Sequence, residues 1–416
     1  MKKEVKIVLP ENIYILKSKP QVNLANGLEE FNIYFENIIS PYKADYDVLV
    51  ECNYGMNLGR SWTINTFPDD ARDFPITIRV YDEYGELLAE KSAEIHLVDK
   101  KRYENPINVL CIGDSMTRGQ IYMENILHKL HKVSFVGTRS LDGIIYHEGR
   151  GGWTFANYFS KAKAGTSDTG ISPFVFPKNV AAKDYAGDYR YIELTQNDNL
   201  GDYYIEGLTS KPISDGQYFL KDGALYKREN DGDILIEEEA EMEFSFPKYM
   251  EKNENVRPDV ISILLGANDL QVCSYENSDM RVDNYVASYQ RFIDSIREYD
   301  KNIPIVINLP AISGDNYHWG LMKKRTGAKT FKFNILKGAE RLLNFESEEN
   351  IYISPMLSCI DIQNGFAKLG FKANKYTETV EIHQNNWVHP NESGYRQMGD
   401  ALAPIIEKIH SELEGK

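Results

Sequence analysis

The first segment with clear chemical potential is Gly-Asp-Ser-Met at 113–116, which directly follows the mostly apolar residues 107–112. An apolar run of this kind is typical of a buried strand. A serine at the turn from such a strand into a helix places its Oγ at the carboxyl edge of the sheet. Its backbone N–H then lies near a helix N-terminus, which favours negative charge. Ser115 therefore suits a nucleophile whose tetrahedral intermediate carries an oxyanion. Taken alone, the segment is better explained by a helix N-cap.

Three further segments add polar groups at positions expected near strand ends. Segment 147–154, His-Glu-Gly-Arg-Gly-Gly-Trp-Thr, has closely spaced glycines that let backbone amides approach a ligand. Segment 266–269 follows another apolar run and places the side-chain amide of Asn268 at the same sheet edge. Segment 386–391, Asn-Trp-Val-His-Pro-Asn, precedes the last expected helix. Each segment alone also fits an ordinary loop, but together they put a hydroxyl, an imidazole and several N–H donors at one edge.

Strands and helices that must position these segments alternate along residues 107–416. Apolar runs predict buried strands at 107–112, 133–136, 260–265, 303–309 and 351–353. Helices are expected near 122–130, 282–296 and 329–343, and from about 393 onward. This alternation predicts a parallel sheet covered by helices, with ligands at the carboxyl ends of its strands.

Residues 1–100 follow a different pattern. Short β-branched or aromatic segments, separated by Asn, Pro and Gly, predict a small antiparallel β-sandwich domain. The polar stretch 99–106 marks the expected boundary to a second domain, residues 105–416. Within that domain, about 155–255 is rich in Tyr, Asp and Gly and predicts an insertion of short strands and loops beside the site. A hairpin is expected at 216–226.

In this order, the four segments resemble the motifs of the Ser-Gly-Asn-His (SGNH) hydrolase superfamily, also called GDSL-type esterases. The resemblance runs from about residue 108 to 409 and is interrupted by the insertion. It implies a flavodoxin-like α/β/α sandwich, in agreement with the alternation of elements. It also implies that Ser115 is the nucleophile and His389 the general base. The oxyanion hole would be formed by the N–H groups of Ser115 and Gly152 and the side-chain amide of Asn268.

One position departs from the family pattern. The family usually has Asp three residues before the His, and this chain has Asn386. We expect Asn386 to accept a hydrogen bond from the Nδ1–H of His389, so that Ser115 and His389 work as a dyad. Two alternatives stay open: another acid, such as Asp361 or Glu381, reaches the ring through the fold, or the substitution weakens activity.

The resemblance and two tryptophans favour a serine esterase that removes O-acyl groups, above all O-acetyl groups, from a carbohydrate. Trp153 directly follows Gly152, and Trp387 lies within the His segment. Flat aromatic faces at a polar site suit sugar rings, so both tryptophans are expected to bind substrate. Core packing is the alternative for each. The alternative functions are a short-chain lipase or thioesterase of the same family, or a catalytically impaired carbohydrate-binding protein.

Composition narrows the range of partners. The 416 residues include 47 Lys and Arg against 62 Asp and Glu, a net charge of −15. Such a surface disfavours nucleic acid and anionic membranes and suits a neutral small molecule or oligosaccharide. The four cysteines have neither metal-site nor redox spacing, and His128 and His131 are followed by no third ligand at metal-site spacing. We therefore expect no metal and no cofactor, and the oligomeric state stays open.

The sequence shows no targeting segment as written. Its N-terminal apolar run is broken by Glu4, Lys6 and Pro10 before it reaches signal-peptide length. No later stretch approaches the roughly 20 apolar residues of a membrane span. The expectation is a cytoplasmic protein, or a secreted one from which a signal segment has been removed.

Overall fold

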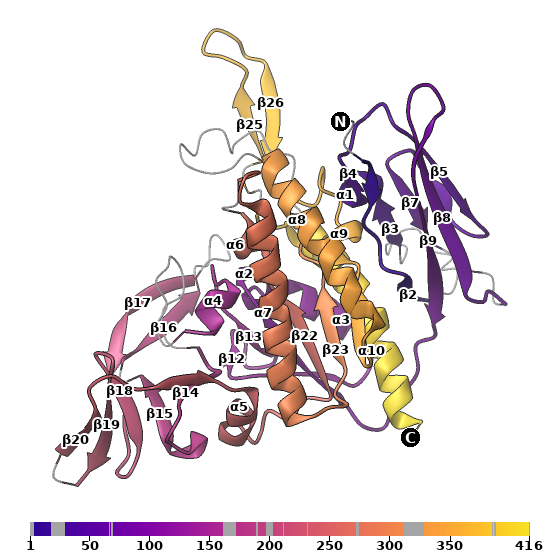
Figure 1. The fold of residues 1–416 in the computed structure, drawn as a ribbon. Coiled ribbons are helices and arrows are strands. Elements are labelled where there is room, and N and C mark those ends of the chain that lie inside the picture. The colour runs from indigo at the N-terminus through magenta and orange to yellow at the C-terminus, as the bar shows by residue number, and fades with distance from the viewer. Residues whose placement is uncertain are drawn as a thin grey trace.

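The computed structural model describes residues 4–17, 30–65, 67, 70–160, 172–188, 190–196, 203–210, 212–230, 232–271, 274–311, 328–384, 386 and 388–415. Within them, a seven-stranded sheet forms the centre of the part of the chain after residue 106 (Figure 1). Its strands are β10 (Ile107–Gly113), β11 (Val133–Val136), β12 (Arg139–Ser140), β13 (Tyr146–Gly149), β22 (Val260–Leu264), β23 (Ile305–Asn308) and β24 (Ile351–Ser354).

The order of these strands confirms the predicted fold class. The path runs β12-β13-β10-β22-β23-β24, with β11 also paired to β10. The pairs are parallel, except that β12 runs antiparallel to β13. The first strand of the unit thus lies between the second and the third, which is the flavodoxin-like order. Ligands are expected where this order reverses, at the carboxyl end of β10.

Helices complete the α/β/α sandwich. Helix α3 (Ile121–Lys129) contacts α10 (Glu392–Glu414), and α10 also contacts β24. Helix α7 (Ser278–Tyr299) contacts both α5 (Phe246–Lys252) and α8 (Ala328–Leu342). The helical spacing predicted in α7 brings Val282, Tyr289 and Ile296 to one face, where each is fully buried.

The described part of residues 4–98 forms small β-sheets, as expected for a β-sandwich. The larger has the order β2-β9-β8-β5, and a second sheet has the order β3-β7-β6. One feature corrects the expectation of a purely antiparallel sandwich, because β2 runs parallel to β9. These two strands are far apart in the chain, so no tight hairpin forces them to run in opposite directions. The elements are β1 (Lys6–Ile7), β2 (Asn12–Leu16), β3 (Phe31–Tyr34), α1 (Phe35–Ile38), β4 (Ile39–Ser40), β5 (Asp47–Cys52), β6 (Met56–Asn57), β7 (Ser61–Ile64), β8 (Phe74–Tyr81) and β9 (Leu87–Val98).

The N-terminal sheets pack against the α/β part along α9 (Met356–Cys359) and α10 (Figure 1). One continuous cluster of buried apolar side chains extends from Val5 to Ile409. The buried Asn37 of α1 donates from Nδ2 to the carbonyls of Leu357 and Ile360, at 3.0 and 2.8 Å. The division at residues 99–106 stays a prediction, because the buried core continues across it.

The insertion between α4 (Phe155–Tyr158) and β22 consists largely of short strands. Its predicted hairpin is β18–β19, whose turn residues Asp222 and Gly223 have φ angles of +53° and +89°. In Figure 1 the sheet β15-β18-β19-β20 lies low beside α5, whereas α2 (Ser115–Arg118), α4 and α6 (Ala267–Leu270) lie higher. The expectation that the insertion lies beside the site stays a prediction. The strands are β14 (Val175–Pro177), β15 (Tyr185–Asp188), β16 (Arg190–Gln196), β17 (Tyr203–Ser210), β18 (Tyr218–Lys221), β19 (Ala224–Glu229), β20 (Gly232–Glu237) and β21 (Met242–Phe244).

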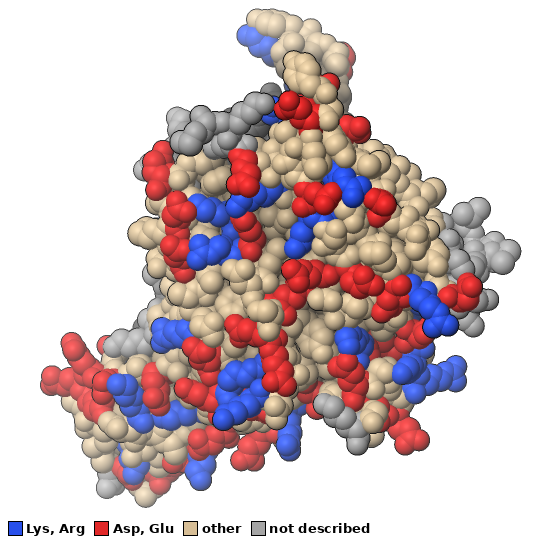
Figure 2. Space-filling model, turned by 45° about the vertical axis from the view of Figure 1, so that its right-hand side comes forward, with Lys and Arg blue, Asp and Glu red and all other residues tan. Residues whose placement is uncertain are grey.

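Two further observations concern the surface of the molecule. The hairpin of β25 (Lys368–Lys372) and β26 (Val380–Gln384) projects from the molecule (Figures 1 and 2). On the face shown in Figure 2, acidic and basic side chains are interspersed. No described helix is long and apolar enough to cross a membrane, and the described residues hold no group of three or more His, Cys, Asp or Glu that could bind a metal.

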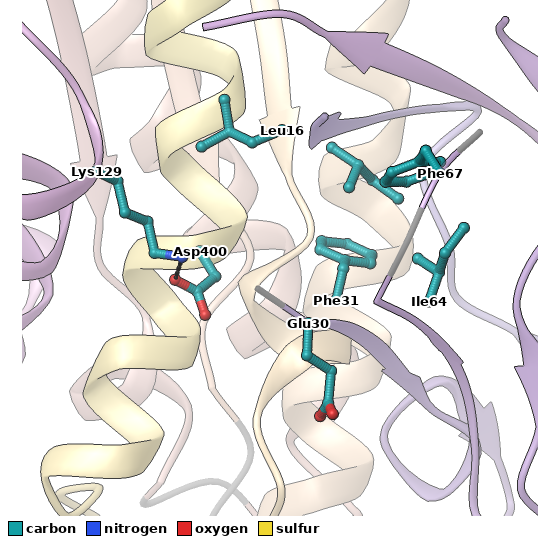
Figure 3. Close-up of a pocket in the computed structure, with 8 residues that line it drawn as sticks. Leu16, Glu30, Phe31, Ile64, Phe67, Lys129 and Asp400 are labelled. Carbon is teal, nitrogen blue, oxygen red and sulfur yellow. Dashed lines mark ion pairs between the residues drawn. The ribbon is translucent and has the colours of Figure 1, made fainter. Parts of the chain in front are cut away.

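A small pocket lies between the N-terminal sheets and helices α3 and α10 (Figure 3). The ion pair between Lys129 and Asp400, at 3.0 Å, forms part of its wall. None of the sequence-predicted site residues lines it. The remaining lining residues are Ile15, Leu16, Glu30, Phe31, Ile64 and Phe67.

Candidate active site

Ser115 stands at the carboxyl end of β10, at the first position of α2. Asp114 is the N-cap of this helix, and its Oδ1 accepts from the backbone N–H of Met116 at 3.0 Å. A Cβ on Gly113 would lie 2.1 Å from Thr117 Oγ1, so only glycine lets the strand turn so closely into α2. The local sequence therefore places a half-buried serine at the sheet edge.

The structure brings Ser115 and His389 together across 274 residues of sequence. The Oγ of Ser115 lies 2.7 Å from Nε2 of His389. His389 belongs to the loop before α10, where Asn391 is the N-cap and accepts from the N–H of Gly394 at 3.1 Å. A hydroxyl and an imidazole at this distance can exchange a proton directly.

Asn268 lies on the same edge, at the second position of α6 directly after β22. Its Nδ2 donates to the carbonyl of Trp153 at 3.1 Å and lies 3.4 Å from Asp114 Oδ2. Its Oδ1 accepts from Gln271 at 2.9 Å, which fixes the orientation of the amide. Gly152 has a φ of +70°, a left-handed conformation suited to glycine. The start of α6 and the segment that contains Gly152 therefore meet near the end of β10.

The structure places Asn386 beside His389 but corrects the expected hydrogen bond. The Oδ1 of Asn386 accepts from the backbone N–H groups of Val388 and His389, at 3.2 and 3.0 Å. Its Nδ2 is therefore the atom that faces Nδ1 of His389, at 3.5 Å. Because Oδ1 is held by two backbone donors, it does not accept from the ring. A donor in this position disfavours the Nδ1–H tautomer that a general base requires.

The two acids considered as substitutes have other surroundings. The Oδ1 of Asp361 lies 3.1 Å from Arg60 and also accepts from the N–H groups of Gln363 and Asn364. Glu381 lies on β26 and is exposed. Asp361 therefore holds its own turn and an arginine of the N-terminal sheets, and does not act as the third member of a triad.

The tryptophans expected to bind substrate have different outcomes. Trp153 is 1% exposed, with its ring packed against Tyr158 and the guanidinium of Arg150. This corrects the expectation of a sugar platform, because the face of a buried indole is not open to a ligand. Trp387 lies outside the described residues.

Residues His147 and Glu148, expected in a loop, belong to strand β13. Glu148 is fully buried and pairs with Arg150 at 2.7 Å, and Tyr249 donates to it at 2.8 Å. Burial, aided by Arg150, lowers the pKa of His147 to about 3, so its ring is neutral. These partners stabilise polar residues in a strand that sequence periodicity does not reveal.

Two buried carboxyl groups lie behind the site. Burial raises the pKa of Asp114 to about 7, and burial with the neighbouring Asp114 raises that of Asp269 to about 7. Asp269 Oδ1 accepts from the N–H of Phe155 at 3.0 Å, which ties α6 to α4. Both groups connect the segments that carry the site residues.

Comparison with solved structures finds several proteins of low similarity to this chain. A carbohydrate acetylesterase family member from Sinorhizobium meliloti is 11% identical, with a TM-score of 0.35, and the match covers 73% of this chain and 99% of that chain. A possible lipase from Chitinophaga pinensis DSM 2588 is 12% identical, with a TM-score of 0.34 and the same two coverages. A structure described as a peptidoglycan O-acetylesterase in action is 13% identical, with a TM-score of 0.35, and the match covers 74% of this chain and 92% of that chain. These values are too low to transfer a substrate.

No curated protein matches the chain. The profile of the GDSL-like lipase/acylhydrolase family, in contrast, matches residues 109–402, well over half of the sequence. The matched range contains all four segments that carry the candidate site. The chain therefore belongs to the GDSL-like lipase/acylhydrolase family.

Proposed function

We propose that this hydrolase is a serine esterase that removes O-acetyl groups from a carbohydrate through an acyl-enzyme on Ser115. The observation that carries the proposal is the 2.7 Å contact between Ser115 Oγ and His389 Nε2 at the carboxyl end of β10. The position of Asn268 on the same edge supports it, because an amide donor there suits a developing oxyanion.

In the first half of the reaction, Ser115 Oγ attacks the ester carbonyl carbon while His389 Nε2 takes the hydroxyl proton. The carbonyl oxygen becomes an oxyanion and accepts from the N–H groups of Ser115 and Gly152 and from Asn268 Nδ2. The C–O bond to the sugar then breaks, and the imidazolium returns its proton to the departing hydroxyl.

In the second half, His389 takes a proton from water, whose oxygen attacks the acyl carbon. The same oxyanion donors stabilise the second tetrahedral intermediate. Its collapse releases acetate and returns the proton to Ser115 Oγ. Each half requires His389 Nε2 to begin without a proton, so the tautomer of this ring controls the rate.

The carbohydrate part of the proposal rests on the polar groups around Ser115. Asn268 and Gln271, both half-buried, offer amide groups to a ligand with many hydroxyls. Trp387 lies in sequence between Asn386 and His389, and its expected role in binding a sugar ring stays part of the proposal. A short-chain lipase or thioesterase uses the same chemistry and differs in the group that it must bind.

Acetate release from a panel of acetylated glycans tests the substrate, and p-nitrophenyl esters from acetate to octanoate test the acyl length. Ser115→Ala should abolish turnover and leave the melting temperature close to that of the parent. Ser288→Ala on α7, whose Oγ binds only the carbonyl of Asn284 among described groups, is the matched control and should keep full activity. Turnover by Ser115→Ala would refute the mechanism, and a preference for octanoate would refute the acetyl ester as substrate.

A further inference from the structure

Arg60 lies between β6 and β7 of the N-terminal sheets and contacts two carboxylates. Its Nη2 is 3.0 Å from Glu36 Oε1 and 3.1 Å from Asp361 Oδ1. Glu36 belongs to α1 of the N-terminal part, whereas Asp361 directly follows the α9 segment of the α/β part. Both carboxylate side chains are 16% exposed, so the two ion pairs are partly shielded from water. Arg60 therefore joins two parts of the chain that are 301 residues apart.

Asp361 in turn organises the tight turn 361–365. Its Oδ1 accepts from the backbone N–H groups of Gln363 and Asn364, at 2.9 and 3.2 Å. Its backbone carbonyl accepts from the N–H of Gly365 at 2.6 Å. Burial raises the pKa of Asp361, but hydrogen bonds from Asn364 and Arg60 outweigh burial and hold the pKa below its usual value. The carboxylate is thus ionised at neutral pH and bound to Arg60.

The 361–365 turn holds the loop of His389 from both sides. Before the histidine, the buried Gln384 donates from Nε2 to the carbonyl of Ile362 at 2.6 Å. After it, the backbone N–H of Asn391 donates to the carbonyl of Gly365 at 2.9 Å. An isolated β-bridge between residues 366 and 390 adds a third contact between this turn and the loop of His389. A shift of this turn would therefore move the ring of His389 relative to Ser115.

We propose that Arg60 is a positioning residue, through which the N-terminal sheets hold the 361–365 turn and thereby keep His389 in reach of Ser115. The inference rests on the proposed function, because it assigns Arg60 to the general base of that reaction. It gives the N-terminal part a role in catalysis without a group that touches the substrate. Asp361 then serves the histidine indirectly, through the backbone, and not as its acid partner.

The test measures the rate at which a fluorophosphonate labels Ser115, together with kcat and KM for p-nitrophenyl acetate. In Arg60→Ala, the labelling rate and kcat should fall about tenfold or more, because small misplacements of a catalytic group are costly. KM should stay within about twofold, because no substrate contact is lost. Arg60→Lys should recover part of the loss, and millimolar guanidinium should restore part of the kcat of Arg60→Ala.

Arg79→Ala is the matched control, because Arg79 also pairs with two carboxylates, Glu51 and Glu90, within the N-terminal sheet β2-β9-β8-β5. It should keep the labelling rate and kcat of the parent. Equal losses of labelling rate and kcat in the two variants would overturn the positioning role. It would also be overturned if the loss of activity in Arg60→Ala matched the fraction of unfolded protein in a melting curve. An unchanged Arg60→Ala would overturn it as well. The absence of labelling in the unmodified protein would instead overturn the proposed function.

Discussion

Replacing Asn386 by Asp should make this enzyme faster. In the structure, Oδ1 of Asn386 accepts from the N–H groups of Val388 and His389, and Nδ2 faces the ring at 3.5 Å from Nδ1. The isosteric change Asn386→Asp keeps the first oxygen on the backbone and puts a second oxygen where Nδ2 lies. That oxygen accepts from Nδ1–H, which selects the tautomer with an unprotonated Nε2 facing Ser115.

The size of the gain follows from what a carboxylate contributes at this position. In serine proteases, exchanging the triad Asp for Asn costs about 10⁴ in kcat. The ring of His389 here already lies within 2.7 Å of Ser115, so positioning is retained and only the tautomer and charge are at stake. We expect kcat to rise by on the order of 10², or about 2.7 kcal/mol of transition-state stabilisation. The carboxylate also favours the imidazolium, so the acid limb of the pH–rate profile should move to higher pH.

Steady-state kinetics of both proteins from about pH 5 to 9 on p-nitrophenyl acetate measure the effect across the range where histidine titrates. Asn374→Asp, between β25 and β26, adds the same charge away from the ring and should leave kcat unchanged. An unchanged or lower kcat in Asn386→Asp would refute the reasoning. It would mean that Nδ1–H of His389 already has an acceptor and that the site is built without a carboxylate at this position.

Three further outcomes follow from the geometry. Asn268→Ala should lower kcat by about 10²–10³, as loss of one oxyanion donor does; a change in KM alone in steady-state kinetics would assign Asn268 to substrate positioning. In Gly149→Ala, the added Cβ would lie 2.4 Å from the backbone N of Arg118, so thermal melts should show a loss of about 1–3 kcal/mol, and an unchanged melting temperature would contradict this packing. The pKa of Asp269 is raised from 3.8 to about 7, so its favourable contribution is present below pH 3.8 and is lost as the pH rises toward 7. Asp269→Asn should therefore flatten the fall in unfolding free energy across that range in urea titrations, and an unaltered slope would contradict the raised pKa.

The elements that sequence predicts well are those that local pattern determines. All five residues of β22 are buried and four of them are apolar, and the helical spacing in α7 matches its buried face. Strand β13 was missed because it contains His147 and Glu148, which periodicity assigns to a loop. Its stability comes from partners such as Tyr249, which lies 101 residues further along the chain. Such pairing leaves no local signal.

The candidate site likewise has features that the sequence predicts and features that only the folded structure reveals. The types and order of the motifs were sufficient to predict that Ser115 and His389 meet, because parallel strands bring their carboxyl ends to one edge. The role of Trp153 was predicted wrongly, because adjacency to a glycine in sequence does not say which way the indole points. The amide of Asn386 is oriented by two backbone N–H groups, and that orientation depends on the conformation of the loop.

Asp361 illustrates why residue types alone do not assign a catalytic acid. As a carboxylate in the last quarter of the chain, it was a reasonable partner for His389. Its actual partners are Arg60, on the far side of the N-terminal junction, and the backbone of its own turn. The consequence is that the loop of the general base is anchored to a part of the chain that contains no family motif. With Arg60 in this positioning role, the N-terminal sheets would be part of the catalytic architecture, although they supply no group that touches the substrate.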